Sequence, residues 1–324
     1  MNQAEATHTR PLASVIIPAY NAAPYIKEAL DSVLGQTFSP IEIIVVNDGS
    51  PDTPALEEVL APYRSHIIYL QQENRGLAGA RNTGIRAATG DYVALLDADD
   101  IWLPDYLQEQ VGFLEEHPEY ALVYCNAKFF GDHIHDGMEY MDVCDSQGEA
   151  TASAIITRRC HVFVSVAARR EVLASLLFDE SLRSCEDFDC WLRLTAAGHR
   201  IGYHRKVLVR YRKHSASLSA NGLNMAEHSI RVMGNALSLW PPSSREHQEL
   251  LVAKAQRTAD LEILKAKIAL SEQRIPDAIS HLEEANVYLK ATKLAAIIAG
   301  LRLMPAPISA LFKLRGSLFR AHRH

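Results

Sequence analysis

Short apolar runs alternate with amphipathic segments through the first hundred residues. The apolar runs lack polar alternation, so they predict strands buried on both faces at 14–19, 41–47, 66–71 and 91–97. Between them, apolar residues recur at helical spacing and predict helices at 22–36, 54–63 and 76–88. This alternation predicts an α/β fold with a Rossmann-like, mostly parallel sheet flanked by helices.

The pattern is more mixed between residues 105 and 215. It predicts a strand at 121–130, with helices at 104–116 and 186–197. The stretch 131–150 is polar and rich in Gly and Asp, so we expect a loop or hairpin over the ligand-binding edge of the sheet. Residues 201–214 predict one or two short strands.

The chain becomes continuously helical after about residue 222. Residues 261–289 predict a helix pair with a turn at 273–276, which resembles one tetratricopeptide-like unit or forms a simple helical appendage. We therefore expect an α/β domain at 1–221, an all-helical extension at 222–289 and a separate tail at 290–324.

The tail, 290–324, contains seven Lys and Arg residues and no Asp or Glu. Its basic residues interleave with apolar ones, which predicts amphipathic helices that lie on an anionic membrane surface. The alternative is a basic helix packed on the acidic α/β domain or on a second subunit.

Composition narrows the function classes. The 324 residues are 48% hydrophobic and 22% charged, and a net charge of −6 argues against a general nucleic-acid binder. Five scattered cysteines without a Cys-x-x-Cys pattern favour reduced thiols in a cytoplasmic protein. The polar N-terminus lacks a signal-peptide core, and no apolar run approaches the roughly 20 residues that span a bilayer.

Polar residues follow three of the four predicted parallel strands. They are Pro18 to Asn21, Asn47 to Ser50, and Asp97 to Asp99. Ligands bind at the carboxyl ends of strands in such sheets, so we expect these tips to face one crevice and share a ligand. An Asx-turn in Asn-Asp-Gly-Ser is the structural alternative for Asp48.

The sequence VALLDADD, residues 93–100, places three carboxylates directly after a buried strand. Carboxylates this close repel one another, and a divalent cation would turn the repulsion into attraction. Carboxylate oxygens suit Mg²⁺ or Mn²⁺. Helix capping is the alternative, and we favour it for Asp100 because Ile-Trp-Leu-Pro follows.

Five short motifs in order resemble the family-two inverting glycosyltransferases of GT-A fold, over about residues 12–215. They are PAYN at 18–21, VNDGS at 46–50, ENRGLAGARNTG at 73–84, GDYVALLDADD at 90–100 and the Glu-Asp pair at 186–187.

The resemblance implies a set of donor-binding residues. Asp48 is expected to accept the imide N–H of uracil or thymine, in a pocket lined by Pro18 and Tyr20. Arg81 is expected near the nucleotide. The Asp-Ala-Asp segment continues the site. Its Asp97 is expected to contact the ribose and the metal region, Ala98 to lie beside the donor, and Asp99 to bind the cation that bridges both phosphates. His214 is a further metal ligand by resemblance, and Arg212 could instead neutralise the diphosphate.

Asp187 is the candidate general base, because a single displacement needs one carboxylate to take the acceptor proton. We expect Glu186 to orient rather than to react. Both residues open a predicted helix, whose dipole should lower their pKa values and keep the base ionised. The alternative is ordinary acidic enrichment of a first helical turn.

The sequence thus predicts a metal-dependent, inverting hexosyl- or hexosaminyltransferase. It would use a UDP-sugar or dTDP-sugar with Mg²⁺ or Mn²⁺, and a glycan or lipid-linked glycan as acceptor. We expect it in the cytoplasm, either free or peripheral on the inner face of the cell membrane. One rival is a sugar nucleotidyltransferase, although AYNAAPY replaces the Gly-rich loop which that class carries after strand one. The other rival is a catalytically silent glycan-binding or scaffold protein.

Overall fold

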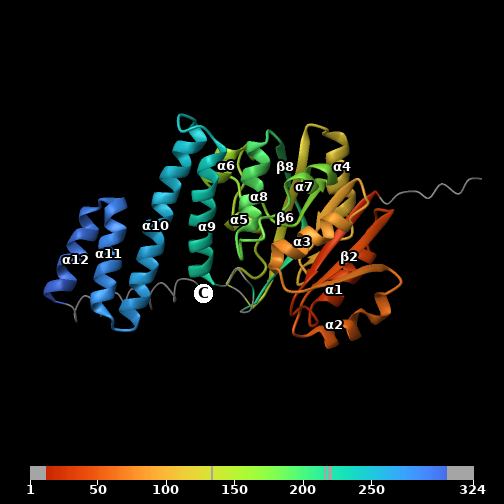
Figure 1. Ribbon diagram of the computed structural model, residues 1–324, viewed down its shortest axis with the longest axis horizontal. Coiled ribbons are helices and arrows are strands. Elements are labelled where there is room, and N and C mark those ends of the chain that lie inside the picture. Colours follow the sequence, from red (N-terminus) through yellow and green to blue (C-terminus); the bar gives the residue numbers. More distant parts are fainter. Residues whose placement is uncertain (1–11, 133, 215–216, 218–220, 305–324) are drawn as a thin grey trace, which may run out of the picture. The chain divides into compact units, whose positions relative to one another are not determined.

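The computed structural model describes residues 12–132, 134–214, 217 and 221–304. The chain divides into two compact units, residues 1–214 and 215–324, and each is described by itself. The predicted domain boundary at 221–222 lies close to this division. Figure 1 shows the helices of the second unit, α9 to α12, and the sheet and helices of the first.

The first unit is built on one eight-stranded sheet with the order β3-β2-β1-β4-β7-β6-β8-β5. Its strands are β1 (Ala13–Ala19), β2 (Ile41–Asp48), β3 (Ile67–Gln72), β4 (Tyr92–Leu95), β5 (Ile101–Trp102), β6 (Tyr120–Gly131), β7 (Val166–Arg169) and β8 (Arg200–Lys213). The predicted strands β1 to β4 run parallel to one another, and β6 is parallel to β8. The α/β class and the mostly parallel core of the sheet are therefore confirmed.

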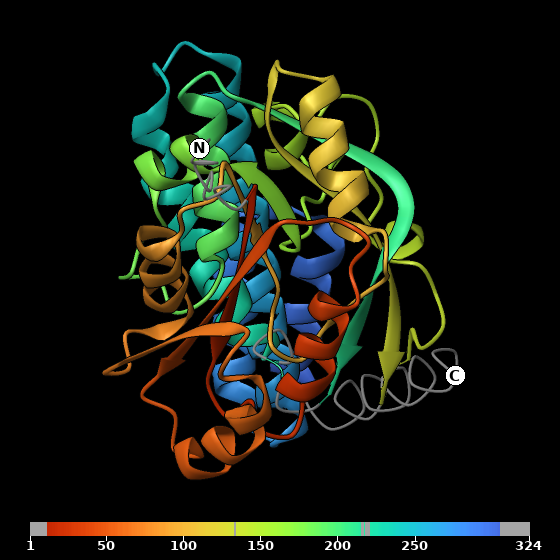
Figure 2. The ribbon, with the colours of Figure 1, turned by 90° about the vertical axis from the view of Figure 1, so that its right-hand side faces the viewer.

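Helices lie on both sides of this sheet, as Figures 1 and 2 show. They are α1 (Ile26–Leu34), α2 (Thr53–Leu60), α3 (Gly76–Ala87), α4 (Tyr106–Glu116), α5 (Tyr140–Val143), α6 (Ala152–Ile156), α7 (Arg170–Leu176) and α8 (Glu186–Ala196). Small residues let α3 approach the sheet closely. A Cβ on Gly84 would lie 2.4 Å from Cγ2 of Ile16, which is closer than packing allows.

Three features of the first unit differ from the sequence predictions. The strand β3 is not buried on both faces, because it lies at the edge of the sheet, and its Ile68 is 42% exposed. Residues 200–213 form one long strand, β8, rather than one or two short ones. Asp100 does not cap a helix, because β5 follows it and α4 begins only at Tyr106. The reason is long-range pairing, since β5 joins the edge of the sheet against β8, about a hundred residues later in the chain.

The second unit contains α9 (Gly222–Ala236), α10 (Arg245–Ser271), α11 (Ile275–Leu289) and α12 (Thr292–Leu303). The predicted turn is confirmed: Gln273 has a φ of 63°, and Pro276 lies in the first turn of α11. α12 contributes Ile298 and Leu301 to a core built with apolar residues of α10 and α11. Part of the predicted tail is thus core, while residues 305–324 lie outside the described residues.

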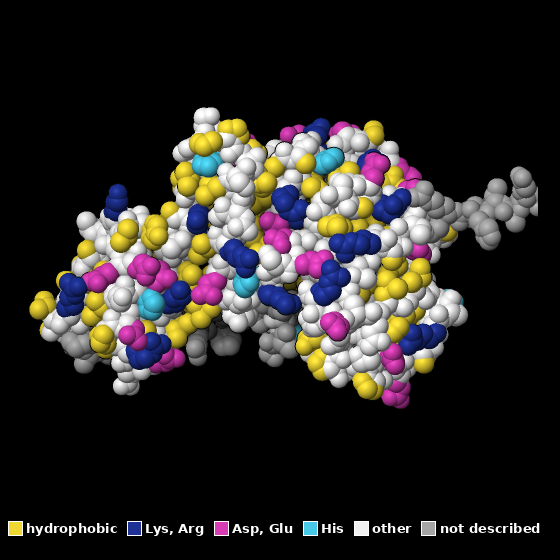
Figure 3. All heavy atoms as spheres, in the orientation of Figure 1, with side chains coloured by type: hydrophobic (Ala, Val, Ile, Leu, Met, Phe, Trp, Pro, Cys, Tyr) yellow, Lys and Arg dark blue, Asp and Glu magenta, His cyan; other side chains and the backbone are white. Residues whose placement is uncertain are grey.

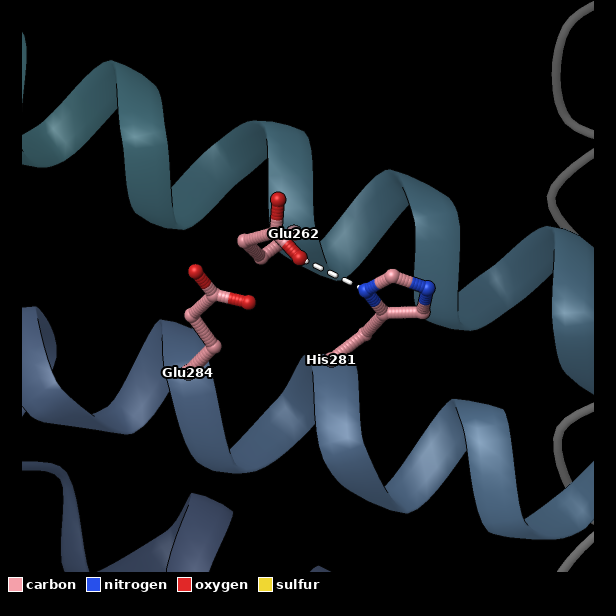
Figure 4. A group of neighbouring side chains, drawn as sticks. All are labelled: Glu262, His281 and Glu284. Atoms are coloured by element: carbon pink, nitrogen blue, oxygen red, sulfur yellow. Dashed lines mark hydrogen bonds and ion pairs between the residues drawn. The ribbon is translucent and has the colours of Figure 1, made fainter.

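A polar group joins α10 and α11 (Figure 4). Glu262 is 5% exposed, and its Oε2 lies 2.6 Å from Nδ1 of His281, with Glu284 close by. Lys265 lies 3.0 Å from the other Glu262 oxygen. Burial opposes ionisation of Glu262, but the hydrogen bonds from His281 and Lys265 outweigh it and hold its pKa below the ordinary value. The buried charge is therefore compensated by protein side chains.

Charged side chains of both signs lie intermixed on the face of the second unit seen in Figure 3. The exposed hydrophobic residues of this unit include Val252, Val287 and Leu303. None of the described helices combines the length and the hydropathy needed to traverse a lipid bilayer.

Candidate active site

The ends of β1 and β2 are fastened to each other at the carboxyl edge of the sheet. The backbone N–H of Asn21 donates to Oγ of Ser50 at 2.7 Å, and that of Ala23 donates to Asp52 at 2.9 Å. Asn47, rather than Asp48, forms the Asx-turn, because its Oδ1 accepts from the backbone N–H of Ser50. The turn therefore does not account for Asp48.

Asp48 lies at the end of β2 and is 2% exposed. Its Oδ1 accepts from Nε2 of Gln72 at 2.7 Å and from the backbone N–H of Arg75 at 2.8 Å. These bonds fix the carboxylate and leave Oδ2 for a ligand donor. Neither Gln72 nor Arg75 was singled out from the sequence, because their role depends on how β3 and its following loop reach Asp48.

The other predicted pocket residues differ in exposure. Tyr20 follows β1 and is 50% exposed, so its ring is available for contact with a base. Pro18 is buried in β1, beyond the last residue of that strand which pairs with β4. Ala98 is buried between the two aspartates.

The three carboxylates after β4 have different partners. Asp97 accepts from Nη2 of Arg81 at 2.7 Å. Oδ2 of Asp99 lies 3.1 Å from Nε2 of His214. Asp100 is buried, and its Oδ1 accepts from the backbone N–H of Arg212 at 2.8 Å, whereas its Oδ2 has no partner among the described residues.

The acidic tip carries more negative charge than its protein partners compensate. Burial, followed by the charge of Asp97, raises the pKa of Asp99 above its usual value in spite of His214. Burial and the charges of Asp99 and Asp97 raise the pKa of Asp100 well above its usual value. A cation at the tip would oppose both shifts, because its positive charge stabilises the ionised carboxylates.

His214 and Arg212, at the end of β8, are held against this tip. The His214 ring stacks on Tyr25 with centroids 5.0 Å apart. Nε of Arg212 donates to the backbone oxygen of Asp99 at 2.7 Å, and its Nη2 donates to Glu28 at 2.9 Å. Arg212 would have to release these partners to neutralise a diphosphate.

The donor set at the tip fits a divalent cation. A carboxylate of Asp99 beside the imidazole of His214 offers hard oxygen and borderline nitrogen, which suits Mn²⁺. Among the described residues, the one group of three His, Cys, Asp or Glu side chains with ligand atoms within 4.8 Å of one another is Glu262, His281 and Glu284, which lies in the second unit and not at the tip. The tip therefore supplies a pair of ligands, and a cation there would take further oxygens from phosphate or water.

Lys213 is a residue near the acidic tip that was not singled out from the sequence. Burial lowers the pKa of its ammonium group, while the charges of Asp100, Asp99 and Asp97 oppose the change. Its Nζ also donates to Oη of Tyr211 at 2.6 Å. Its position in Tyr-Arg-Lys-His, directly before the predicted metal ligand His214, is the sequence feature that could have indicated it.

Arg81 lies in α3 and is 1% exposed. Its Nη2 contacts Asp97, and its Nη1 donates to Oε1 of Glu186 at 2.6 Å. Arg81 is therefore not a solvated helix arginine. Direct contact with a nucleotide stays a prediction, and it would require one of these ion pairs to open.

Glu186 and Asp187 form the first turn of α8, after Cys185 with a φ of 59° in the left-handed region. Asp187 is half-buried, and its Oδ1 accepts from the backbone N–H of Phe188 at 2.7 Å. Burial and the charge of Glu186 raise the pKa of Asp187 to about 6, with Arg81 opposing them. The expected lowering by the helix dipole is therefore wrong for Asp187, because desolvation outweighs it.

Comparison with known proteins shows the family of this chain. The sequence profile described as Glycosyl transferase family 2 matches residues 14–165. An uncharacterized glycosyltransferase of Rickettsia prowazekii is 33% identical over 225 residues, which cover 67% of this chain and 69% of the relative. The putative teichuronic acid biosynthesis glycosyltransferase TuaG of Bacillus subtilis is 32% identical, over 66% of this chain and 84% of the relative.

Two solved structures share the fold. S. aureus TarS, crystallised with UDP-GlcNAc, superposes with a TM-score of 0.65 at 21% identity, covering 96% of this chain and 92% of that one. The mannosyltransferase PcManGT of Pyrobaculum calidifontis, in complex with GDP-Man and Mn²⁺, gives a TM-score of 0.62 at 23% identity, covering 97% and 87%. At these sequence identities the similarity shows only that the fold is shared.

Proposed function

Because the chain belongs to glycosyl transferase family 2 and has the GT-A fold, we propose that it transfers a sugar from a UDP-sugar or dTDP-sugar to a hydroxyl group of a glycan or lipid-linked glycan, with inversion. The observation that carries the proposal is the arrangement of carboxylates. Asp48 is the last residue of β2, and Asp97 and Asp99 follow the parallel strand β4 of the same sheet. Asp97 is linked through Arg81 to the helix that begins with Glu186 and Asp187.

The donor base binds at Asp48. Its Oδ1 is held by Gln72 and Arg75, and its Oδ2 is the atom that receives the imide N–H of uracil or thymine. The half-exposed ring of Tyr20 offers a face for the base. The nucleotide sugars bound by TarS and PcManGT, UDP-GlcNAc and GDP-Man, support a nucleotide-sugar donor but differ in their base.

The donor diphosphate binds at the acidic tip together with Mg²⁺ or Mn²⁺. Asp99 and His214 would hold the cation, and Asp97 faces the ribose. When bound, the cation stabilises the negative charge that develops on the departing diphosphate. The raised pKa values of Asp99 and Asp100 and the Mn²⁺ in the PcManGT complex support this part of the proposal.

Asp187 acts as the general base. Its free Oδ2 takes the proton of the acceptor hydroxyl as the acceptor oxygen forms a bond to the anomeric carbon. The bond from that carbon to the diphosphate breaks on the opposite side, and the nucleoside diphosphate leaves with the electron pair. A pKa of about 6 leaves most Asp187 side chains ionised and basic at neutral pH.

The acceptor is proposed at the level of its class. The name of TuaG supports polysaccharide biosynthesis, and a lipid-linked acceptor would bring the enzyme to the cytoplasmic face of the membrane. The basic residues of 290–324 support contact with anionic lipid there. Four of them, Lys313, Arg315, Arg320 and Arg323, come after the last described residue.

Calorimetric titration tests the donor site with UDP, dTDP and GDP, each with Mn²⁺ and with a chelator. UDP and dTDP should bind more tightly than GDP, and chelation should weaken UDP binding by about tenfold or more. Asp99→Asn should abolish the difference that Mn²⁺ makes, while the exposed Glu115→Gln should behave as wild type. Equal UDP affinity with and without Mn²⁺ would remove the cation from the proposal, and a preference for GDP would contradict the predicted base.

A further inference from the structure

Arg81 is the one described side chain that bonds both to the acidic tip and to the start of α8. Its Nη2 to Asp97 Oδ1 distance is 2.7 Å, and its Nη1 to Glu186 Oε1 distance is 2.6 Å. Asp97 stands two residues before Asp99, and Glu186 directly precedes Asp187. The donor half and the base half of the proposed site are thus joined through one guanidinium group.

The guanidinium cannot leave this position without a large rearrangement. It is 1% exposed, its carbon lies 5.5 Å from the centre of the Phe178 ring, and the adjoining Asn82 exchanges two hydrogen bonds with the backbone of Phe178. A buried arginine keeps its charge, and a buried charge without a partner is strongly destabilising. The guanidinium and the two carboxylates therefore hold one another in position. Its geometry suits this task because a planar fork can bond two carboxylates at once.

We propose that Arg81 is a positioning residue: it holds Asp97 and Glu186 in one arrangement, and thereby places Asp187 relative to the donor without itself contacting the nucleotide. The inference rests on the proposed function only in taking Asp187 as the base. It differs from the role that family resemblance suggests, since Nη1 and Nη2 are each bonded to a carboxylate and Nε, which has no partner among the described residues, is buried.

The charges around Asp187 make the proposal measurable. Burial, Glu186 and Asp97 raise the pKa of Asp187, and Arg81 lowers it. The charge of Asp187 in turn raises the pKa values of Tyr140 and Cys190. Removing Arg81 should therefore move the titration of Asp187 to higher pH, and removing the charge of Glu186 should move it to lower pH.

The test is a carbon-13 NMR titration of aspartate carboxyls in the free, full-length protein, with Asp187 assigned from Asp187→Asn. In Arg81→Gln we expect Asp187 to titrate about one pH unit higher than in wild type. In Arg81→Lys, which keeps the charge, the shift should be smaller, and in Glu186→Gln it should have the opposite sign. Arg86→Gln removes an exposed positive charge from the same helix and should leave Asp187 unchanged.

Calorimetry with UDP and Mn²⁺ and release of UDP from UDP-GlcNAc complete the test. Arg81→Gln should lower UDP affinity only a few-fold, through Asp97, while turnover falls by about a hundredfold, because the base is misplaced. If Arg81→Gln does not fold, Arg81→Lys and Glu186→Gln carry the same comparison.

An unchanged Asp187 titration in the Arg81 and Glu186 variants would overturn the inference. Loss of UDP affinity equal to the loss of turnover would also overturn it, in favour of direct nucleotide contact. Failure of the proposed function would look different, since wild type itself would then bind no UDP or Asp187→Asn would remain active.

Discussion

At the scale of single residues, environment separates carboxylates that look alike in the sequence. Asp48 is fixed by two hydrogen bonds to one oxygen, Asp100 is buried with one oxygen unpaired, and Asp187 is half-buried beside Glu186. The motifs located all three positions. They could not reveal the partners, because Gln72, Arg212 and Arg81 come from distant parts of the chain and approach only in the folded sheet.

The pKa of Asp187 gives a prediction for activity against pH. Its raised value means that the proton is lost, and the base becomes active, as pH rises through about 6. We expect kcat/KM for a UDP-sugar to fall tenfold for each pH unit below that point and to level off above it. A pH–rate profile would check this, and an acidic limb near the ordinary aspartate value of about 4 would show that Asp187 is not desolvated in the working enzyme.

At the scale of elements, the pattern of apolar residues within a segment was sufficient to predict most of the longer strands and helices. The strands β1 to β4 and the helices α3, α8 and α11 follow from apolar runs or helical spacing. The short elements β5, β7, α6 and α7 were not predicted. β7 is a four-residue strand that runs antiparallel between β4 and β6, so its existence depends on partners at both sides rather than on its own composition.

At the scale of the whole molecule, the family and fold followed from five motifs, whereas the limits of the helical region did not. α12 begins within the predicted tail, yet its Ile298 and Leu301 are buried in the core of the second unit. Amphipathic spacing alone cannot tell a face that meets a membrane from a face that meets another helix. The membrane proposal therefore depends on the basic residues after Met304.

Vesicle sedimentation tests this proposal. The full chain should bind vesicles containing phosphatidylglycerol and should be released by salt, because each basic residue near an anionic surface contributes about 1 kcal/mol. A chain ending at Met304 keeps α12 and should lose this binding, while neither protein should bind neutral phosphatidylcholine vesicles. Equal binding of both proteins to anionic vesicles would assign the contact to another surface.

The most direct measurement of the central claim compares Asp187→Asn with wild type for two quantities, UDP affinity with Mn²⁺ and the rate of UDP release from UDP-GlcNAc with water as acceptor. The amide keeps the size of the side chain but cannot take a proton at neutral pH. We expect unchanged affinity and a rate lower by about two to four orders of magnitude. A variant that releases UDP at close to the wild-type rate would contradict the assignment of Asp187 as the base, and with it the mechanism proposed for this site.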